Sequence, residues 1–118
     1  MWIMVAGPYT SGGADGTQRA ANLRRMNQAA LALFRMGHVP VVGVNIALPV
    51  IEAGGEACFD EVMMPLSLAL AERCDGCLRL EGASRGADAE AARFLSCGKP
   101  VWTSLSQVPT ARRPAPGG

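Results

Sequence analysis

The sequence lacks the positive charge that a long nucleic-acid interface requires. Its 118 residues carry 11 basic and 10 acidic side chains, which gives a formal net charge of only +1. Binding to polymeric DNA or RNA depends on basic side chains gathered along one face of a protein. We therefore expect no polymeric nucleic acid among the partners of this protein.

The sequence also lacks an apolar run long enough to span a membrane. Glycine, proline or a polar residue interrupts each apolar stretch before it reaches the roughly 20 residues that a membrane span requires. The first apolar run, residues 2–6, is too short for a signal peptide and has no basic segment before it. These absences predict a cytoplasmic protein without a membrane partner.

The sequence has a single histidine and four cysteines. Without an export signal, the four cysteines indicate reduced thiols rather than a disulfide framework. Cys74 and Cys77 have the CxxC spacing of a redox or zinc site, but no second CxxC or HxxxH spacing completes four zinc ligands. Cys77 lies in a predicted strand, which favours small buried thiols. His38 lies between a helix-ending glycine and a strand, and we interpret it as structural.

Short apolar runs alternate with amphipathic stretches along most of the chain. Four runs are predicted to be strands: residues 2–6, 39–44, 76–80 and 101–103. Three stretches between them are predicted to be helices: residues 17–36, 59–73 and 86–97. This alternation predicts an α/β domain whose parallel sheet is covered by helices on both faces.

Several details of these elements can also be predicted. Asp15 and Gln18 have the spacing of a capping box, and Pro40 restricts its strand to a strand start or a sheet edge. We expect residues 45–58, which are interrupted by Pro49 and two glycines, to be irregular. The apolar residues expected to face the core from the last two helices are Met63, Leu66, Leu70, Ala87, Ala91, Phe94 and Leu95. The domain is predicted to cover residues 1–108, followed by a disordered tail over residues 109–118.

The stretch 74–90 combines a predicted strand, a turn of small residues and a helix start. The amides of Ser84, Arg85 and Gly86 would be unpaired there, and the helix dipole adds partial positive charge. Such a helix start binds anions, most often phosphate. Glu90 lies about one turn further along, so its carboxylate could face whatever carries that anion. Ser84 could instead be only an N-cap and Glu90 a solvated carboxylate, but the alanines around Glu90 leave room for a ligand.

Two other loops should lie beside this helix start, because ligand sites of parallel α/β sheets form where the strands end. Gly7, Pro8 and Tyr9 begin the first of these loops, and Asn45 follows the second strand. The first loop has neither a Walker A nor a GxGxxG pattern, so ATP and NAD are not supported. It could cradle a ligand or be a surface loop. The Tyr9 ring could stack on a base or cap the core.

Four short motifs together resemble the nucleoside 2-deoxyribosyltransferase-like superfamily, which includes the deoxynucleoside 5′-monophosphate N-hydrolases. The motifs are Gly7-Pro8-Tyr9, Cys74-Asp75, Ser84-x-Gly86-Ala87-x-x-Glu90 and Gly98-Lys99-Pro100. The resemblance covers residues 2–102. It implies a Rossmann-like (flavodoxin-like) three-layer sandwich with a mostly parallel sheet of four to five strands. It also implies N-glycosidic bond cleavage without metal or cofactor, and a homodimer or larger homo-oligomer.

The resemblance implies that Glu90 is the nucleophile that attacks the anomeric carbon. In the family, an aspartate at the position of Ser84 holds the 5′-hydroxyl of free nucleosides, whereas a serine there holds a 5′-phosphate. Ser84 therefore predicts a nucleoside 5′-monophosphate substrate, since an aspartate would repel the phosphate. The predicted substrate-binding residues are Gly7, Pro8, Tyr9, Asn45, Ser84, Arg85 and Gly86.

One position departs from the family pattern. The family usually has a second carboxylate in the preceding helix, where this sequence has Ser67. Without it the departing base has no evident proton donor, unless Asp60, Glu61, Glu81 or a neighbouring subunit provides one. The sequence thus predicts hydrolysis or deoxyribosyl transfer on nucleoside 5′-monophosphates. A non-catalytic nucleotide sensor is the alternative, and a structural partner in an assembly is a weaker one.

Overall fold

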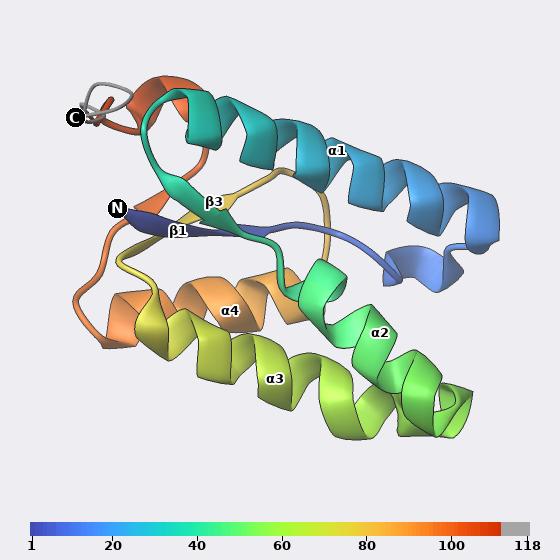
Figure 1. Cartoon of the computed structure of the whole chain (residues 1–118). Helices are drawn as coiled ribbons and strands as arrows, with labels where there is room; N and C mark the ends of the chain where they lie inside the picture. Colours follow the sequence, from blue (N-terminus) through green and yellow to red (C-terminus); the bar gives the residue numbers. More distant parts are fainter. Residues whose placement is uncertain (112–118) are drawn as a thin grey trace, which may run out of the picture.

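Four parallel strands form one sheet in the structure, a computed structural model that describes residues 1–111 (Figure 1). They are β1 (Trp2–Ala6), β2 (Val39–Val41), β3 (Gly76–Arg79) and β4 (Val101–Trp102), in the order β2-β1-β3-β4. Every pairing in this sheet is parallel, and the order is that of the first four strands of a flavodoxin-like sheet. The predicted α/β class and parallel sheet are therefore confirmed.

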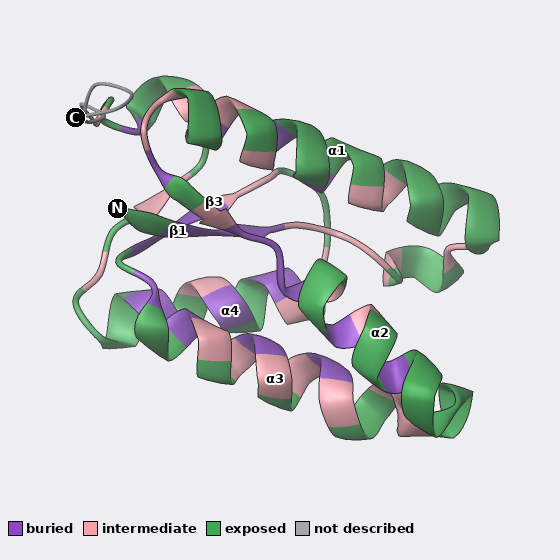
Figure 2. Cartoon of the chain, in the orientation of Figure 1, coloured by how far each residue is buried: buried purple, intermediate pink, exposed green. Residues whose placement is uncertain are grey.

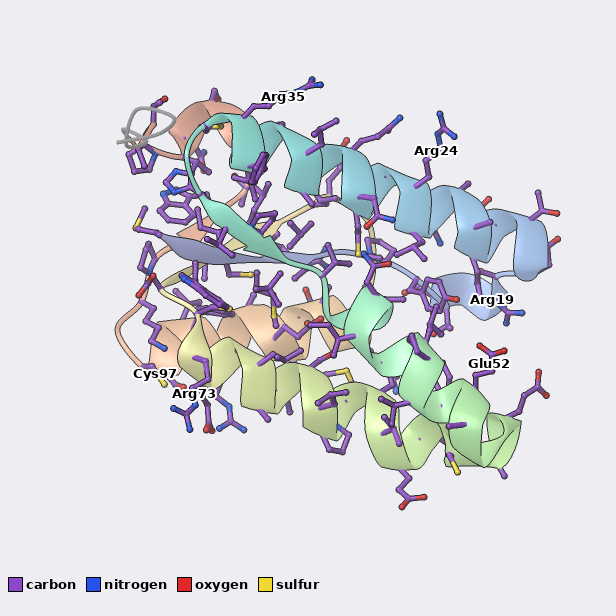
Figure 3. The ribbon with its side chains drawn as sticks, in the orientation of Figure 1. Arg19, Arg24, Arg35, Glu52, Arg73 and Cys97 are labelled. Carbon is purple, nitrogen blue, oxygen red and sulfur yellow. The ribbon has the colours of Figure 1, made fainter. Side chains whose placement is uncertain are left out.

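Helices cover both faces of this sheet. Helix α1 (Gly16–Arg35) lies on one face, and α3 (Phe59–Arg73) and α4 (Arg85–Ser96) lie on the other (Figure 1). Figure 2 shows the buried residues on the strands and on the inward sides of the helices. In Figure 3, Arg24 and Arg35 of α1 point away from the sheet. The predicted three-layer sandwich is thus the observed architecture.

No helix within residues 1–111 is long and apolar enough to cross a lipid bilayer.

Strand β1 is the centre of the core because its side chains alternate between the two faces. Ile3 and Val5 pack into the cluster beneath α1, whereas Met4 and Ala6 pack into the cluster beneath α3 and α4. All four side chains are buried, which explains the continuous apolar run of this strand. The partner strand β2 contains Pro40 and lies at the sheet edge, as predicted.

The capping box predicted at the start of α1 is half formed. The Asp15 carboxylate accepts a hydrogen bond of 2.8 Å from the Gln18 backbone amide. The Gln18 side chain does not return this bond but donates to Asn22 at 2.9 Å. Gly37 follows the helix with φ +94°, the left-handed conformation expected of a helix-ending glycine.

The irregular segment predicted over residues 45–58 is wrong. Most of it forms α2 (Gly43–Gly54), which is followed by a short 3-10 helix (Glu56–Cys58). Pro49 lies inside α2, where it removes one backbone hydrogen bond. Ala47 and Ile51 bury their side chains against α3, and this apolar contact supports the helix despite the proline.

The two helices beneath the sheet each bury a polar residue at the centre of their inward face. Helix α3 buries Ser67 between Met63 and Ala71, while Leu66 and Leu70 lie partly buried beside them. Helix α4 buries Glu90 between Ala87 and Phe94. The predicted inward position of Leu95 is wrong: its side chain is 65% exposed, because it lies about 100° around the helix from Phe94.

Residues 109–111, predicted to begin a disordered tail, contact the domain. The Ala111 amide donates to the Met36 carbonyl at 2.8 Å, and the Pro109 carbonyl lies 2.6 Å from Nε2 of His38. Nδ1 of the same buried ring lies 3.1 Å from the backbone nitrogen of Met1. His38 thus bridges three segments, in agreement with its interpretation as structural. The rest of the predicted tail, residues 112–118, lies outside the described residues.

Candidate active site

A cavity of about 480 Å³ opens where the strands end. The segments that follow β1, β2 and β3 all contribute to its wall, as does the inward face of α3. The volume lies within the range of small-molecule binding sites. The convergence of three loops predicted from the strand order is therefore present.

Six of the eight predicted site residues line this cavity: Gly7, Tyr9, Ser84, Arg85, Gly86 and Glu90. The other two, Pro8 and Asn45, are not among its lining residues. The Pro8 ring packs over Gly82, where a Cβ atom would lie only 2.8 Å from Cγ of the proline. The Asn45 amide donates to Oδ1 of Asn27 at 2.6 Å. Pro8 therefore supports the turn before α4, and Asn45 links α2 to α1.

Glu90 presents its carboxylate to the cavity and has no hydrogen-bond partner among residues 1–111. Its side chain is 9% exposed, and no described residue donates a hydrogen bond to it. Burial raises the pKa of Glu90 from its ordinary value of 4.5 to about 7, and the positive charge of Arg79 partly opposes this rise. A buried carboxyl group that titrates near neutral pH inside a cavity is typical of catalytic acids, bases and nucleophiles.

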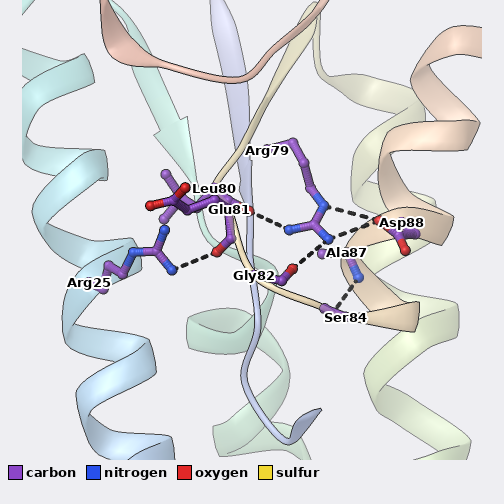
Figure 4. Close-up of polar contacts among 8 residues, drawn as sticks. All are labelled: Arg25, Arg79, Leu80, Glu81, Gly82, Ser84, Ala87 and Asp88. Atoms are coloured by element: carbon purple, nitrogen blue, oxygen red, sulfur yellow. Dashed lines mark hydrogen bonds and ion pairs between the residues drawn. The ribbon is translucent and has the colours of Figure 1, made fainter. Parts of the chain in front are cut away.

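The start of α4 supplies hydrogen-bond donors to the same cavity. The Ser84 hydroxyl oxygen accepts a hydrogen bond of 3.1 Å from the Ala87 amide, so Ser84 is the N-cap of the helix (Figure 4). The hydroxyl hydrogen remains available to a ligand. The amides of Arg85 and Gly86 have no acceptor within the described chain. Unpaired amides and a helix dipole are the features by which helix starts bind anions, and Glu90 lies in the same cavity.

Arg79 holds this helix start in place, and the sequence analysis did not identify it. Its guanidinium donates to the Leu80 carbonyl, to the Gly82 carbonyl at 2.9 Å and to the Asp88 carboxylate at 2.9 Å (Figure 4). The arginine thereby joins the end of β3, the following turn and the first turn of α4. An arginine within an otherwise apolar strand is the signal that could have revealed this role.

The CxxC pair lies in the core. Cys74 and Cys77 are buried among the residues that α3 and α4 pack against the sheet. Burial raises the pKa of Cys74 to about 11 and that of Cys77 to about 12, so both are neutral thiols at neutral pH. The interpretation as small buried thiols is confirmed. Residues 1–111 contain no group of three or more His, Cys, Asp or Glu side chains that could hold a metal ion.

No family model, curated protein or solved structure matches this chain. The likeness to the nucleoside 2-deoxyribosyltransferase-like superfamily thus remains a prediction from short motifs.

Proposed function

We propose that this protein cleaves the N-glycosidic bond of nucleoside 5′-monophosphates, with Glu90 as the nucleophile. The observation that carries the proposal is the position of the Glu90 carboxylate. It is buried, has no hydrogen-bond donor within the described part of the chain, and shares a cavity with the start of α4. One ligand with an anionic end and an electrophilic carbon would satisfy both groups.

In this reaction the 5′-phosphate binds the amides of Arg85 and Gly86 and the hydroxyl of Ser84. A Glu90 oxygen attacks the anomeric carbon and forms a glycosyl ester while the bond to the base breaks. Water or a second base then attacks the same carbon and releases the carboxylate. Tyr9 lines the cavity and offers a ring on which the base stacks. No step requires a metal or a cofactor.

The proposal includes a cytoplasmic location and a homodimer or larger homo-oligomer. Four free thiols support a reducing compartment. Exposed apolar side chains on α1 and α2, among them Leu31, Ile46 and Val50, support contact with a second copy.

A non-catalytic nucleotide sensor is the second candidate. Glu90 is the only carboxylate among the described residues that line the cavity, and none of the alternative proton donors (Asp60, Glu61 and Glu81) does so. A site without a proton donor for the departing base would bind a nucleotide and keep it intact. Calorimetry that shows tight monophosphate binding, together with chromatography that shows no base release, would favour the sensor.

Changing Ser84 to aspartate is expected to weaken binding of nucleoside 5′-monophosphates by about tenfold or more, because the new carboxylate repels the phosphate. Aspartate is also a good N-cap, so the helix start should be preserved. Isothermal calorimetry with a monophosphate and its free nucleoside measures the effect, and only the monophosphate should lose affinity. Equal losses for both ligands would show that the phosphate does not bind at Ser84.

The rate of base release should rise with pH and level off above about 7, because only the ionised Glu90 is a nucleophile. Below that pH, kcat/KM should fall about tenfold per pH unit. The substrate phosphate also titrates, with a second pKa near 6. The affinity of Glu90→Gln across the same pH range therefore serves as the control for phosphate ionisation. A rate that is independent of pH between 5 and 8 would contradict the assignment.

A further inference from the structure

Ser67 is a buried hydroxyl without a protein hydrogen-bond partner in the described chain. Its residue is 3% exposed and lies on the inward face of α3. The hydroxyl group is not sealed inside the protein, since Ser67 lines the cavity that contains Glu90. A polar group buried in this way is expected to have a partner, and the cavity is where a ligand can provide one.

The start of α2 lies against this hydroxyl. A Cβ atom on Gly43 would lie 2.4 Å from Oγ of Ser67, so only glycine allows this approach. Gly43 and Val44, the first residues of α2, line the same cavity. No side chain caps this helix, and their amides have no acceptor within residues 1–111. The cavity thus contains a second helix start, of a 12-residue helix, beside an unpaired hydroxyl.

We infer that Ser67 and the start of α2 bind the carbonyl oxygen of the departing base, so that the substrates are nucleotides of carbonyl-bearing bases such as uracil or thymine. The inference rests on the proposed function and names its substrate class. The two helix starts bind different parts of the substrate. The start of α4 binds the phosphate, and the start of α2 binds the base.

The chemistry explains how the base leaves without a carboxylic acid beside it. As the Glu90 oxygen bonds to the anomeric carbon, the carbon–nitrogen bond breaks and its electron pair stays on the base. In uracil or thymine this charge spreads onto the carbonyl oxygens, where hydroxyl and amide donors stabilise it. The base anion takes a proton from water after release. The water that later hydrolyses the glycosyl ester returns one proton, so charge and atoms balance.

The test compares leaving groups that differ in how much they need stabilisation by these hydrogen-bond donors. The substrates are the 5′-monophosphates of 2′-deoxyuridine and 2′-deoxyadenosine, and 4-nitrophenyl 2-deoxyriboside 5-phosphate, whose phenolate leaves unaided. Ser67→Ala is expected to lower kcat for the uracil nucleotide by about 100-fold, the lower end of the effect of losing a transition-state donor. On the nitrophenyl substrate kcat should change less than about twofold. Adenine, which has no carbonyl oxygen, should be released more slowly than uracil by the parent protein.

Two further variants accompany Ser67→Ala. Gly43→Ala pushes the Ser67 hydroxyl from its position and should cause the same selective loss. Ser96→Ala, an exposed serine on α4, should change neither rate. Thermal unfolding confirms that each variant is folded.

The outcomes separate this inference from the proposed function. Equal losses on both leaving groups, no loss on either, or faster release of adenine would overturn the inference while Glu90-dependent cleavage stands. Failure of the parent protein to cleave any of the three substrates would overturn both.

Discussion

Replacing Glu90 with glutamine is expected to lower the rate of base release from a nucleoside 5′-monophosphate by on the order of 10⁴-fold or more. The glutamine amide has nearly the same shape but cannot form the glycosyl ester. The change should not weaken substrate binding, since the proposed phosphate site is at the start of α4. Chromatography of the released base measures the rate, and calorimetry measures the affinity.

The matched control is Glu81→Gln, which removes an exposed carboxylate from the turn before α4, outside the cavity. This variant should retain the rate of the parent protein. A Glu90→Gln variant that releases base within about tenfold of the parent rate would remove Glu90 from the role of nucleophile.

Replacing Glu90 with glutamine is also expected to stabilise the folded protein above neutral pH. Moving the pKa of a carboxyl group from 4.5 to about 7 corresponds to roughly 3 kcal/mol of destabilisation once the group is ionised. A carboxyl group whose pKa is raised by folding costs nothing below its unfolded pKa. The cost grows as pH rises from 4.5 and is complete above about 7. The free energy of unfolding of Glu90→Gln should therefore be higher than that of the parent by up to about 3 kcal/mol at pH 8. At pH 4 the two values should differ little.

Urea unfolding at pH 4, 6 and 8 measures this difference. The other carboxylates titrate alike in both proteins, so they cancel in the comparison. Glu81→Gln, as an exposed substitution, should show no such pH-dependent gain. An equal gain at pH 4 and pH 8 would place the effect in packing rather than in the charge of Glu90.

Sequence patterns were sufficient for most of the strands and helices, but the strand predicted over residues 39–44 is wrong at its end, since β2 stops at Val41 and Gly43 begins α2. The run of residues 2–6 has no polar residue, as a central parallel strand requires, and β1 has those bounds. Helix α2 could not be predicted because Pro49 and the glycine pair are local signals against a helix. The contact between α2 and α3 that outweighs them is a tertiary interaction.

Some features of the candidate site could likewise be predicted from the sequence, and others could not. Ser84 and Gly86 could be identified because a helix start is a local feature that small and capping residues mark in the sequence. The burial of Glu90 and Ser67 depends on how α3 and α4 rotate against the sheet, and the apolar residues around them did not define that rotation. The role of Arg79 depends on carbonyl groups in the following turn and on Asp88, which the fold brings together.

Because Gly86 and Glu90 both lie on α4, helical rise sets the distance between the proposed phosphate site and the carboxylate. Glu90 is the fourth residue after Gly86, which is about 6 Å along the axis. In the proposed site, this spacing limits the length of a ligand that can contact both groups. A single phosphate on the 5′ carbon would place the anomeric carbon near Glu90, whereas a chain of two or three phosphates would carry the sugar past it. Selection for monophosphates would then follow from length alone.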